Sequence, residues 1–202
     1  MMERAGAGPW TRLWIAAAVV WHLLGAGLHW RDAQRIQGGN DYASYHYAAV
    51  VALQGGDPYD RAALSGAARD AETRKGVHPF FYPPPFLLGM VWSPAFELHT
   101  AYRVWFVVDE LLALLCGWLL WRGWGGLSPL VGPVVAGSLA LLTAVPNNHV
   151  MGQANFPVLA LVLGGLLLEG QGRQVAGGAL MGAACMAKMS PALFVAWWLL
   201  RG

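Results

Sequence analysis

The feature that most constrains this chain is a series of apolar stretches that carry no formal charge and are long enough to cross a bilayer. Leu13–Trp30 contains no Asp, Glu, Lys or Arg, and neither does Ser128–Leu168. About 20 apolar residues in a helix span the hydrocarbon core of a membrane. Of the 202 residues, 56% are hydrophobic and only 12% are charged, which is not the composition of a soluble surface. We therefore expect an integral membrane protein.

The apolar stretches indicate helices on either side of one long polar loop. We expect the first transmembrane helix at Leu13–Trp30 and the loop at residues 31–100. The other transmembrane helices are expected within residues 101–202, at Ala101–Trp121, Pro129–Val145, Phe156–Leu168 and Val175–Leu200. The last should form two half-helices, because Lys188 and Pro191 interrupt it. The sequence thus predicts an all-α, polytopic transmembrane helical bundle that forms a single membrane domain over residues 1–202.

Positive charge predicts the orientation of the chain. Arg4 and Arg12 precede the first helix, which places the N-terminus in the cytoplasm and the polar loop on the extracytoplasmic face. The apolar segment Phe86–Phe96 is short and interrupted by a proline, so we expect it to dip into the membrane from outside. In the alternative, residues 86–97 cross the membrane, which would leave Arg122 outside, against the positive-inside rule.

The polar loop is expected to contain helices. Asn40-Asp41 precedes apolar residues at helical spacing, and Gly55-Gly56 follows them. A second helix is expected from Asp60 to about Lys75. We interpret both as amphipathic juxtamembrane helices that lie at the membrane surface. The three prolines at 83–85 are expected to block regular structure.

Composition and spacing argue against several partners and cofactors. The net charge of +2 and the lack of a basic run with interleaved aromatic residues argue against nucleic acid. Cys116 and Cys185 lie in apolar runs, so we expect neither a disulfide nor a cysteine metal site. No spacing typical of metal ligands, a catalytic triad or a phosphate loop occurs. We expect no metal and no other cofactor.

Asp41 is the candidate catalytic residue. At the start of a helix an Asp commonly caps the backbone, and position alone favours that role. A carboxylate partly shielded by Tyr42 and Tyr45 could instead act as a general base that takes a proton from an acceptor hydroxyl. Rival carboxylates, of which the last two look like turn and cap residues, are Asp32, Asp57 and Asp60.

Lys188 is the candidate for binding a phosphate. An ionisable side chain within a membrane segment is costly and therefore suggests function. Lys188 could stabilise the charge on a departing lipid phosphate, or it could be a structural partner of Asp109 or Glu110. Arg103 could bind the same anion, or it could reach to lipid headgroups.

Other polar residues within apolar sequence are weaker candidates. Gln153 and Asn155, in the polar break Pro146–Asn155, offer amides for sugar hydroxyls but could equally cap the next helix. His22 is interpreted as an ordinary polar interruption of its helix. His46 follows Asp41 by five positions and is expected off the face of that residue.

Five short motifs follow one another along nearly the whole chain. They are Asn40-Asp41-Tyr42 with Tyr45 and Ala48-Ala49, Gly56-Asp57-Pro58-Tyr59-Asp60, Phe81-Tyr82-Pro83-Pro84, Gly152-Gln153-Ala154-Asn155, and Ala176-Gly177 with Lys188-Met189-Ser190-Pro191. In this order they resemble glycosyltransferase family 87, the polyprenol-phosphate-mannose-dependent α-mannosyltransferases with the GT-C fold.

The resemblance implies a membrane enzyme that moves a hexose, expected to be mannose, from a polyprenyl-phosphate donor to an acceptor hydroxyl of a glycolipid or glycan. Transfer would be inverting and extracytoplasmic, in the lipid bilayer of a bacterial plasma membrane. Asp41 matches the family's catalytic acid. The positions expected to contact substrate are Tyr82, Gln153, Asn155 and Lys188, with Arg103 added from its charge.

Two alternatives to an active transferase stay open. Family members are longer than this chain, which suggests a fragment or a natural truncation that is inactive alone. A non-enzymatic lipid or solute transporter would use Lys188, Asp109 and Glu110 as a charged pathway. A transferase, by contrast, requires Asp41, Tyr82 and Lys188 to face one cavity, with Asp41 within about 15 Å of Lys188.

Overall fold

The computed structural model describes residues 8–33, 41–71, 76–124 and 144–201, and every regular element in these ranges is a helix. The predicted all-α fold class is therefore confirmed. Some predictions lie outside the described residues: Arg4, the end of the second loop helix near Lys75, and most of the expected span Pro129–Val145.

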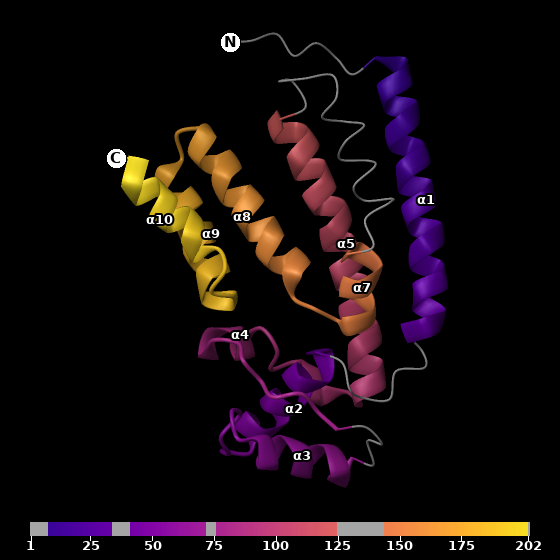
Figure 1. Cartoon of the computed structure of the whole chain (residues 1–202), viewed down its shortest axis with the longest axis vertical. Helices are drawn as coiled ribbons and strands as arrows, with labels where there is room; N and C mark the ends of the chain where they lie inside the picture. Colours follow the sequence, from indigo (N-terminus) through magenta and orange to yellow (C-terminus); the bar gives the residue numbers. More distant parts are fainter. Residues whose placement is uncertain (1–7, 34–40, 72–75, 125–143, 202) are drawn as a thin grey trace.

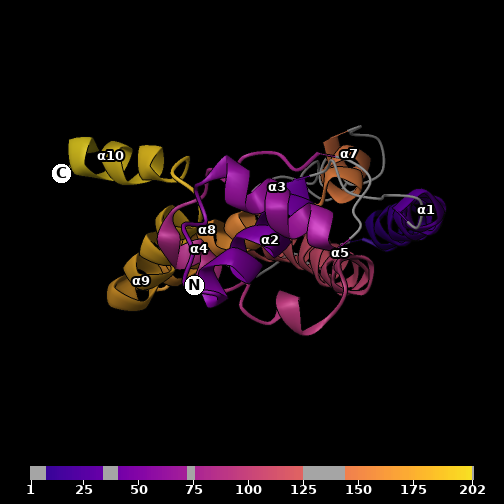
Figure 2. The same ribbon diagram turned by 90° about the horizontal axis from the view of Figure 1, so that it is seen from below.

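Long helices stand side by side, and a layer of short helices lies at one end of them (Figure 1). The long helices are α1 (Pro9–Ala33), α5 (Leu98–Trp124), α8 (Asn155–Gly170) and α9 (Gln174–Ala187). Two shorter helices accompany them, α7 (Ala144–Met151) and α10 (Ala192–Arg201). The short layer consists of α2 (Asp41–Leu53), α3 (Arg61–Asp70), α4 (Pro84–Leu88) and the 3₁₀ turn Ser93–Ala95. Figure 2 shows this layer from below, in front of the ends of the longer helices.

α5 is the helix best suited to cross a membrane. Among the described residues it alone is both long enough and apolar enough to do so, and only 33% of its apolar window is buried inside the protein. Shorter apolar helical segments cover Arg12–Leu28, Asn155–Gly170 and Gln174–Ala187. The helices expected at Leu13–Trp30 and Ala101–Trp121 are confirmed as helices. The polytopic transmembrane bundle stays a prediction.

α8 and α9 pack closely because two glycines face each other. A Cβ on Gly165 would lie 3.0 Å from the carbonyl oxygen of Gly177, and a Cβ on Gly177 would lie 2.8 Å from that of Gly165. α9 ends at Ala187, the next residue, Lys188, has an extended backbone, and α10 begins directly after Pro191. The predicted division of the last apolar run into two half-helices is therefore confirmed.

α2 is the core of the short layer. Every residue from Tyr42 to Ala49 is buried, and the helix packs against α3, α4, α5 and the 3₁₀ turn. The Tyr45 ring lies 5.0 Å from that of Phe86 and 6.4 Å from that of Trp105, measured between ring centroids. The prediction of an amphipathic surface helix is wrong for α2, because small and aromatic residues occur on all its sides and neighbouring elements cover them.

α3 does have the predicted amphipathic character. It buries Leu64 and Ala68 and exposes its charged ends. It begins after Asp60, whose carboxylate accepts a hydrogen bond from the Ala62 N–H at 2.8 Å, so the cap role predicted for Asp60 is confirmed. The helix ends at Asp70, with Ala71 as its C-cap.

The proline-rich segment starts a helix instead of blocking one. Pro84 is the first residue of α4, a position where the missing N–H of proline costs nothing. α4 has five residues and the 3₁₀ turn Ser93–Ala95 has three. At about 1.5 Å per residue, α4 is roughly 8 Å long, far less than the hydrocarbon core of a membrane. Residues 86–97 therefore contain no crossing helix, as expected for a shallow path.

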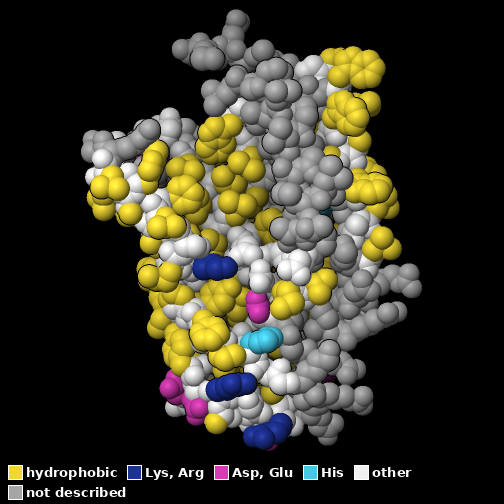
Figure 3. All heavy atoms as spheres, viewed as in Figure 1, with side chains coloured by type: hydrophobic (Ala, Val, Ile, Leu, Met, Phe, Trp, Pro, Cys, Tyr) yellow, Lys and Arg dark blue, Asp and Glu magenta, His cyan; other side chains and the backbone are white. Residues whose placement is uncertain are grey.

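Large hydrophobic side chains are exposed over much of the described surface. On the face shown in Figure 3, they gather over the described parts of the long helices, and the charged and histidine side chains visible on this face lie at its middle and lower levels. The exposed large hydrophobic residues include Trp14 on α1, Leu111 on α5 and Leu199 on α10. Apolar surface of this extent indicates contact with lipid or with another protein.

Candidate active site

A line of hydrogen bonds joins four of the predicted site residues, here called the Asp41–Lys188 line. The Gln153 side-chain amide donates to Asp41 Oδ2 at 2.8 Å. The Asn155 amide donates to Gln153 Oε1 at 2.8 Å, and Lys188 Nζ donates to Asn155 Oδ1 at 2.6 Å. The line brings together the first turn of α2, the start of α8 and the end of α9. Segments far apart in the sequence thus meet at one place.

The separation of the two charged groups meets the limit expected for a transferase. Asp41 and Lys188 are joined through only two carboxamides, a path of at most roughly 13 Å when hydrogen bonds of this length are combined with amide dimensions. Asp41, Gln153 and Lys188 are half-buried, and Asn155 is exposed. The line therefore lies where a substrate can reach it.

Tyr82 lies beside the lysine end of the line. Lys188 Nζ is 5.8 Å from the centroid of the Tyr82 ring, which is a cation–π distance. The Tyr45 hydroxyl donates to Tyr82 Oη at 2.7 Å. Burial raises the pKa of Tyr82, and the negative charge of Asp41 raises it further. The phenol of Tyr82 is thus neutral at physiological pH and can donate a hydrogen bond to a ligand.

Asp41 is positioned by a helix whose polar side chains are satisfied in the core. Ser93 Oγ lies 2.8 Å from Tyr42 Oη and 2.8 Å from His46 Nδ1, and all three residues are buried. Ser44 Oγ donates to the backbone carbonyl of Asp41 at 2.7 Å. Burial lowers the pKa of His46 to about 4, so its imidazole is neutral at pH 7. His46 therefore fixes α2 and takes no part in the Asp41–Lys188 line.

Gln153 is positioned by a tight turn at Gly152. This residue has φ +65°, and a Cβ on it would lie 2.6 Å from Tyr42 Cβ and 3.0 Å from Tyr102 Cε2. Only glycine meets both the backbone and the space requirement. Asn148 Nδ2 donates to the Gln153 carbonyl at 3.3 Å. The polar break was predicted at Pro146–Asn155, but only residues 152–154 are not helical, because α7 continues to Met151 and α8 begins at Asn155.

The remaining candidates lie apart from the line. Arg103 is exposed on α5, and none of the three bonds of the line involves it. Asp57 accepts a hydrogen bond from the Tyr59 N–H at 2.9 Å, which confirms its predicted turn role. The side chain of Asp32 lies outside the described part of the chain.

A second group of ionisable residues, which the sequence did not reveal, lies between α1, α5 and α7. Glu110 Oε1 is 2.7 Å from His22 Nε2, and Glu110 Oε2 is 2.8 Å from His149 Nε2. His149 Nδ1 is 3.0 Å from Asp109 Oδ2. The interpretation of His22 as an ordinary polar interruption is wrong, and so is that of Lys188 as the partner of Asp109 or Glu110. The sequence did contain a feature that could have indicated this group: acidic residues and histidines occur within apolar segments, where their burial is costly unless they are paired.

A family model described as glycosyltransferase family 87 matches residues 80–202, which is more than half of the chain. The match includes Tyr82, Gln153, Asn155 and Lys188 and begins after Asp41. Neither the curated proteins nor the solved structures give a match.

Proposed function

Because the chain belongs to glycosyltransferase family 87, we propose that it transfers mannose from a polyprenyl-phosphate donor to an acceptor hydroxyl of a glycolipid or glycan, with inversion. Family membership itself establishes glycosyl transfer in general, and with it a sugar donor and an acceptor. The proposal of a polyprenyl-phosphate donor and inverting transfer rests on the Asp41–Lys188 line. Its two ends are a carboxylate and an ammonium group, with two side-chain amides between them.

Inverting transfer requires a base for the acceptor and a stabilised phosphate as leaving group. Asp41 is the base: its carboxylate takes the proton of the acceptor hydroxyl while that oxygen attacks the anomeric carbon. The bond from the anomeric carbon to the phosphate oxygen breaks, and polyprenyl phosphate departs with the electron pair. Lys188 supplies positive charge where this negative charge develops. The separation of the two groups along the line leaves room for a sugar between them.

The residues between these two groups suit a hexose. Gln153 and Asn155 present amides that can exchange their bonds to each other for bonds to sugar hydroxyls. Tyr82 presents an aromatic ring beside Lys188, which the apolar face of a hexose can cover. Arg103 is proposed to contact the donor phosphate or lipid headgroups from its exposed place on α5.

The proposed setting is the bacterial plasma membrane, with the chain as one membrane domain of GT-C type. Members of the family are membrane enzymes, and α5 can cross a bilayer. The exposed apolar residues of α1, α5 and α10 would face lipid. Residues 31–100, with the short helices, would lie on the extracytoplasmic side, and the N-terminus in the cytoplasm.

A transporter with a charged pathway receives less support. Its three charges would need to lie along one route. Lys188 belongs to the Asp41–Lys188 line, whereas Asp109 and Glu110 bind histidines between α1, α5 and α7.

The decisive experiment replaces Asp41 in the full chain, reconstituted in vesicles with radiolabelled polyprenyl-phosphate mannose and a membrane extract as acceptor. Asp41→Asn keeps the size of the side chain and its acceptor for Gln153 but removes the base. Transfer should fall by about 10²–10⁴-fold, the usual contribution of a positioned base. Binding of the labelled donor should be unchanged.

A matched control is Asp57→Asn, since Asn also serves as a turn acceptor. This variant should retain full transfer. If Asp41→Asn retains it as well, the base is another residue and the assignment fails.

A further inference from the structure

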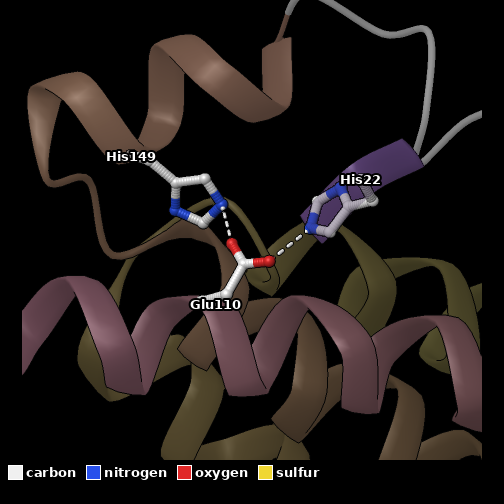
Figure 4. A group of neighbouring side chains, drawn as sticks. All are labelled: His22, Glu110 and His149. Carbon is white, nitrogen blue, oxygen red and sulfur yellow. Dashed lines mark ion pairs between the residues drawn. The ribbon is translucent and has the colours of Figure 1, made fainter. Parts of the chain in front are cut away.

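The buried group at His22, Glu110 and His149, here called the three-helix cluster, has no part in the proposed transfer. Figure 4 shows its side chains converging, His22 from α1, Glu110 from α5 and His149 from α7. His22 is 6% exposed and His149 is 2% exposed, and the Glu110 side chain is 12% exposed. So much buried polarity between apolar helices requires a physical reason.

We propose that the three-helix cluster binds a divalent transition-metal cation, with Zn²⁺ as the best fit. Two imidazole nitrogens and one carboxylate oxygen form a ligand set that zinc sites use. The three ligand atoms lie within 4.8 Å of one another. Two metal bonds of about 2.1 Å allow a separation of at most about 4.2 Å, so small side-chain movements complete the site.

The contacts within the cluster support a cation at its centre. Glu110 divides its two carboxylate oxygens between the imidazoles, one facing His22 and the other facing His149, at 2.7 and 2.8 Å. These are ion-pair distances, and beyond these pairs no other hydrogen-bond partner of either Glu110 oxygen or of His149 Nε2 lies among the described residues. Side chains that already converge this closely need little movement to share one ion. A metal ion between them accounts for that convergence.

The surroundings of His149 are those of a metal ligand. Its Nδ1 lies 3.0 Å from Asp109 Oδ2, and Asn148 Nδ2 donates to the same oxygen at 2.6 Å. A metal-bound histidine usually gives its other ring N–H to a carboxylate, which fixes the ring and leaves Nε2 as the ligand atom. Asp109 is therefore assigned as a positioning residue that orients His149.

Charge is balanced when a divalent ion occupies the cluster. The carboxylates of Asp109 and Glu110 together neutralise one divalent cation, and both histidines stay neutral. Balance matters at this depth: Glu110 lies about 18 Å along α5 from Leu98, which is near the middle of the bilayer if α5 crosses it. An unbalanced charge there would be costly.

The proposal is tested by metal analysis of the full chain, purified in detergent with a tag that contains no histidine. After treatment with a chelator, reloading with Zn²⁺ and washing, elemental analysis should find about one Zn²⁺ per chain, as for a single three-ligand site. Reloading with Co²⁺ should produce the visible absorption of tetrahedral cobalt. His149→Ala and Glu110→Gln should lose both signals.

Two variants make the result specific. His78→Ala removes an exposed histidine outside the cluster and should keep both signals. Asp109→Asn keeps all three ligands and should weaken Zn²⁺ binding by about 10–100-fold in competition with a chromophoric chelator. This variant decides the matter if His149→Ala and Glu110→Gln do not fold. No Zn²⁺ in the wild type, metal retained by a folded Glu110→Gln variant, or unchanged affinity in Asp109→Asn would each overturn the proposal.

Discussion

Replacing Gly152 with alanine tests the turn that carries Gln153, and the structure gives two separate costs. The first is conformational: Gly152 has φ +65°, and a non-glycine residue in this left-handed region loses about 1–2 kcal/mol. The second is crowding, because the new Cβ would lie 2.6 Å from Tyr42 Cβ and 3.0 Å from Tyr102 Cε2. Tyr42 Cβ cannot rotate away from the contact, and overpacking of this kind costs about 1–3 kcal/mol. Gly152→Ala should therefore destabilise the protein by about 3 kcal/mol.

Gly172→Ala is the matched control. Gly172 has φ +78°, but a Cβ on it would have nothing within 4 Å, so only the conformational cost applies. This variant should lose about 1 kcal/mol. For a chain of this size, 1 kcal/mol lowers the midpoint of thermal unfolding by about 2–4 °C. We expect midpoints about 3 °C lower for Gly172→Ala and about 10 °C lower for Gly152→Ala, measured by tryptophan fluorescence in detergent.

The difference between the two variants isolates the crowding. Equal shifts would show that the neighbours of Gly152 give way, and would refute the argument that the turn is fixed by Tyr42 and Tyr102. Transfer activity adds a second readout, at a temperature where both variants are folded. Gly152→Ala should be impaired, because Gln153 moves with the turn, and Gly172→Ala should not.

Lowering the pH should destabilise the protein through His46. Burial lowers its pKa from 6.5 to about 4, so the unfolded chain takes up a proton first, and stability that is complete above pH 6.5 falls by about 3 kcal/mol towards pH 4. Unfolding midpoints measured across this range should vary less in His46→Gln, and an equal slope would contradict the assignment. Lys188→Met should lower kcat for transfer by about 10²-fold, with partial retention in Lys188→Arg, as expected for a group that stabilises developing charge. Tyr82→Phe keeps the ring beside Lys188 and should retain more transfer than Tyr82→Ala in the same assay; the reverse order would refute an aromatic role.

Most helices could be predicted because the length of an apolar run and the positions of proline and glycine determine local backbone structure. The run before Trp30 and the run from Ala101 both became helices, and Lys188 with Pro191 divided the last run as expected. Several residues of the candidate site could also be named from the sequence. Asp41, Gln153 and Lys188 each stood out as polar residues beside apolar sequence, and the structure brings these three together. Their contacts, however, depend on tertiary packing and could not be derived from spacing.

The wrong prediction for α2 and the missed three-helix cluster have the same cause. The type of a side chain does not show which other parts of the chain pack against it. α2 looked amphipathic because its apolar residues, Tyr42 and Tyr45 among them, recur at helical spacing, yet Ser93 satisfies the hydroxyl of Tyr42 and the imidazole of His46 inside the core. A better sign was available: residues 42–53 contain no formal charge, which is more typical of a buried helix. The three-helix cluster was missed because its members are far apart in the sequence, at positions 22, 110 and 149.

The Asp41–Lys188 line and the three-helix cluster are connected through the turn between α7 and α8. Asn148 donates both to Asp109, beside the three-helix cluster, and to the backbone carbonyl of Gln153, in the Asp41–Lys188 line. His149 lies one residue further on, and Tyr102 donates to its backbone carbonyl. The cluster therefore holds the turn from the buried side, while the half-buried line meets the substrate. We therefore expect substitutions in the half-buried or exposed line to cost little stability, and substitutions in the buried cluster to shift the turn and, through Asn148, the position of Gln153.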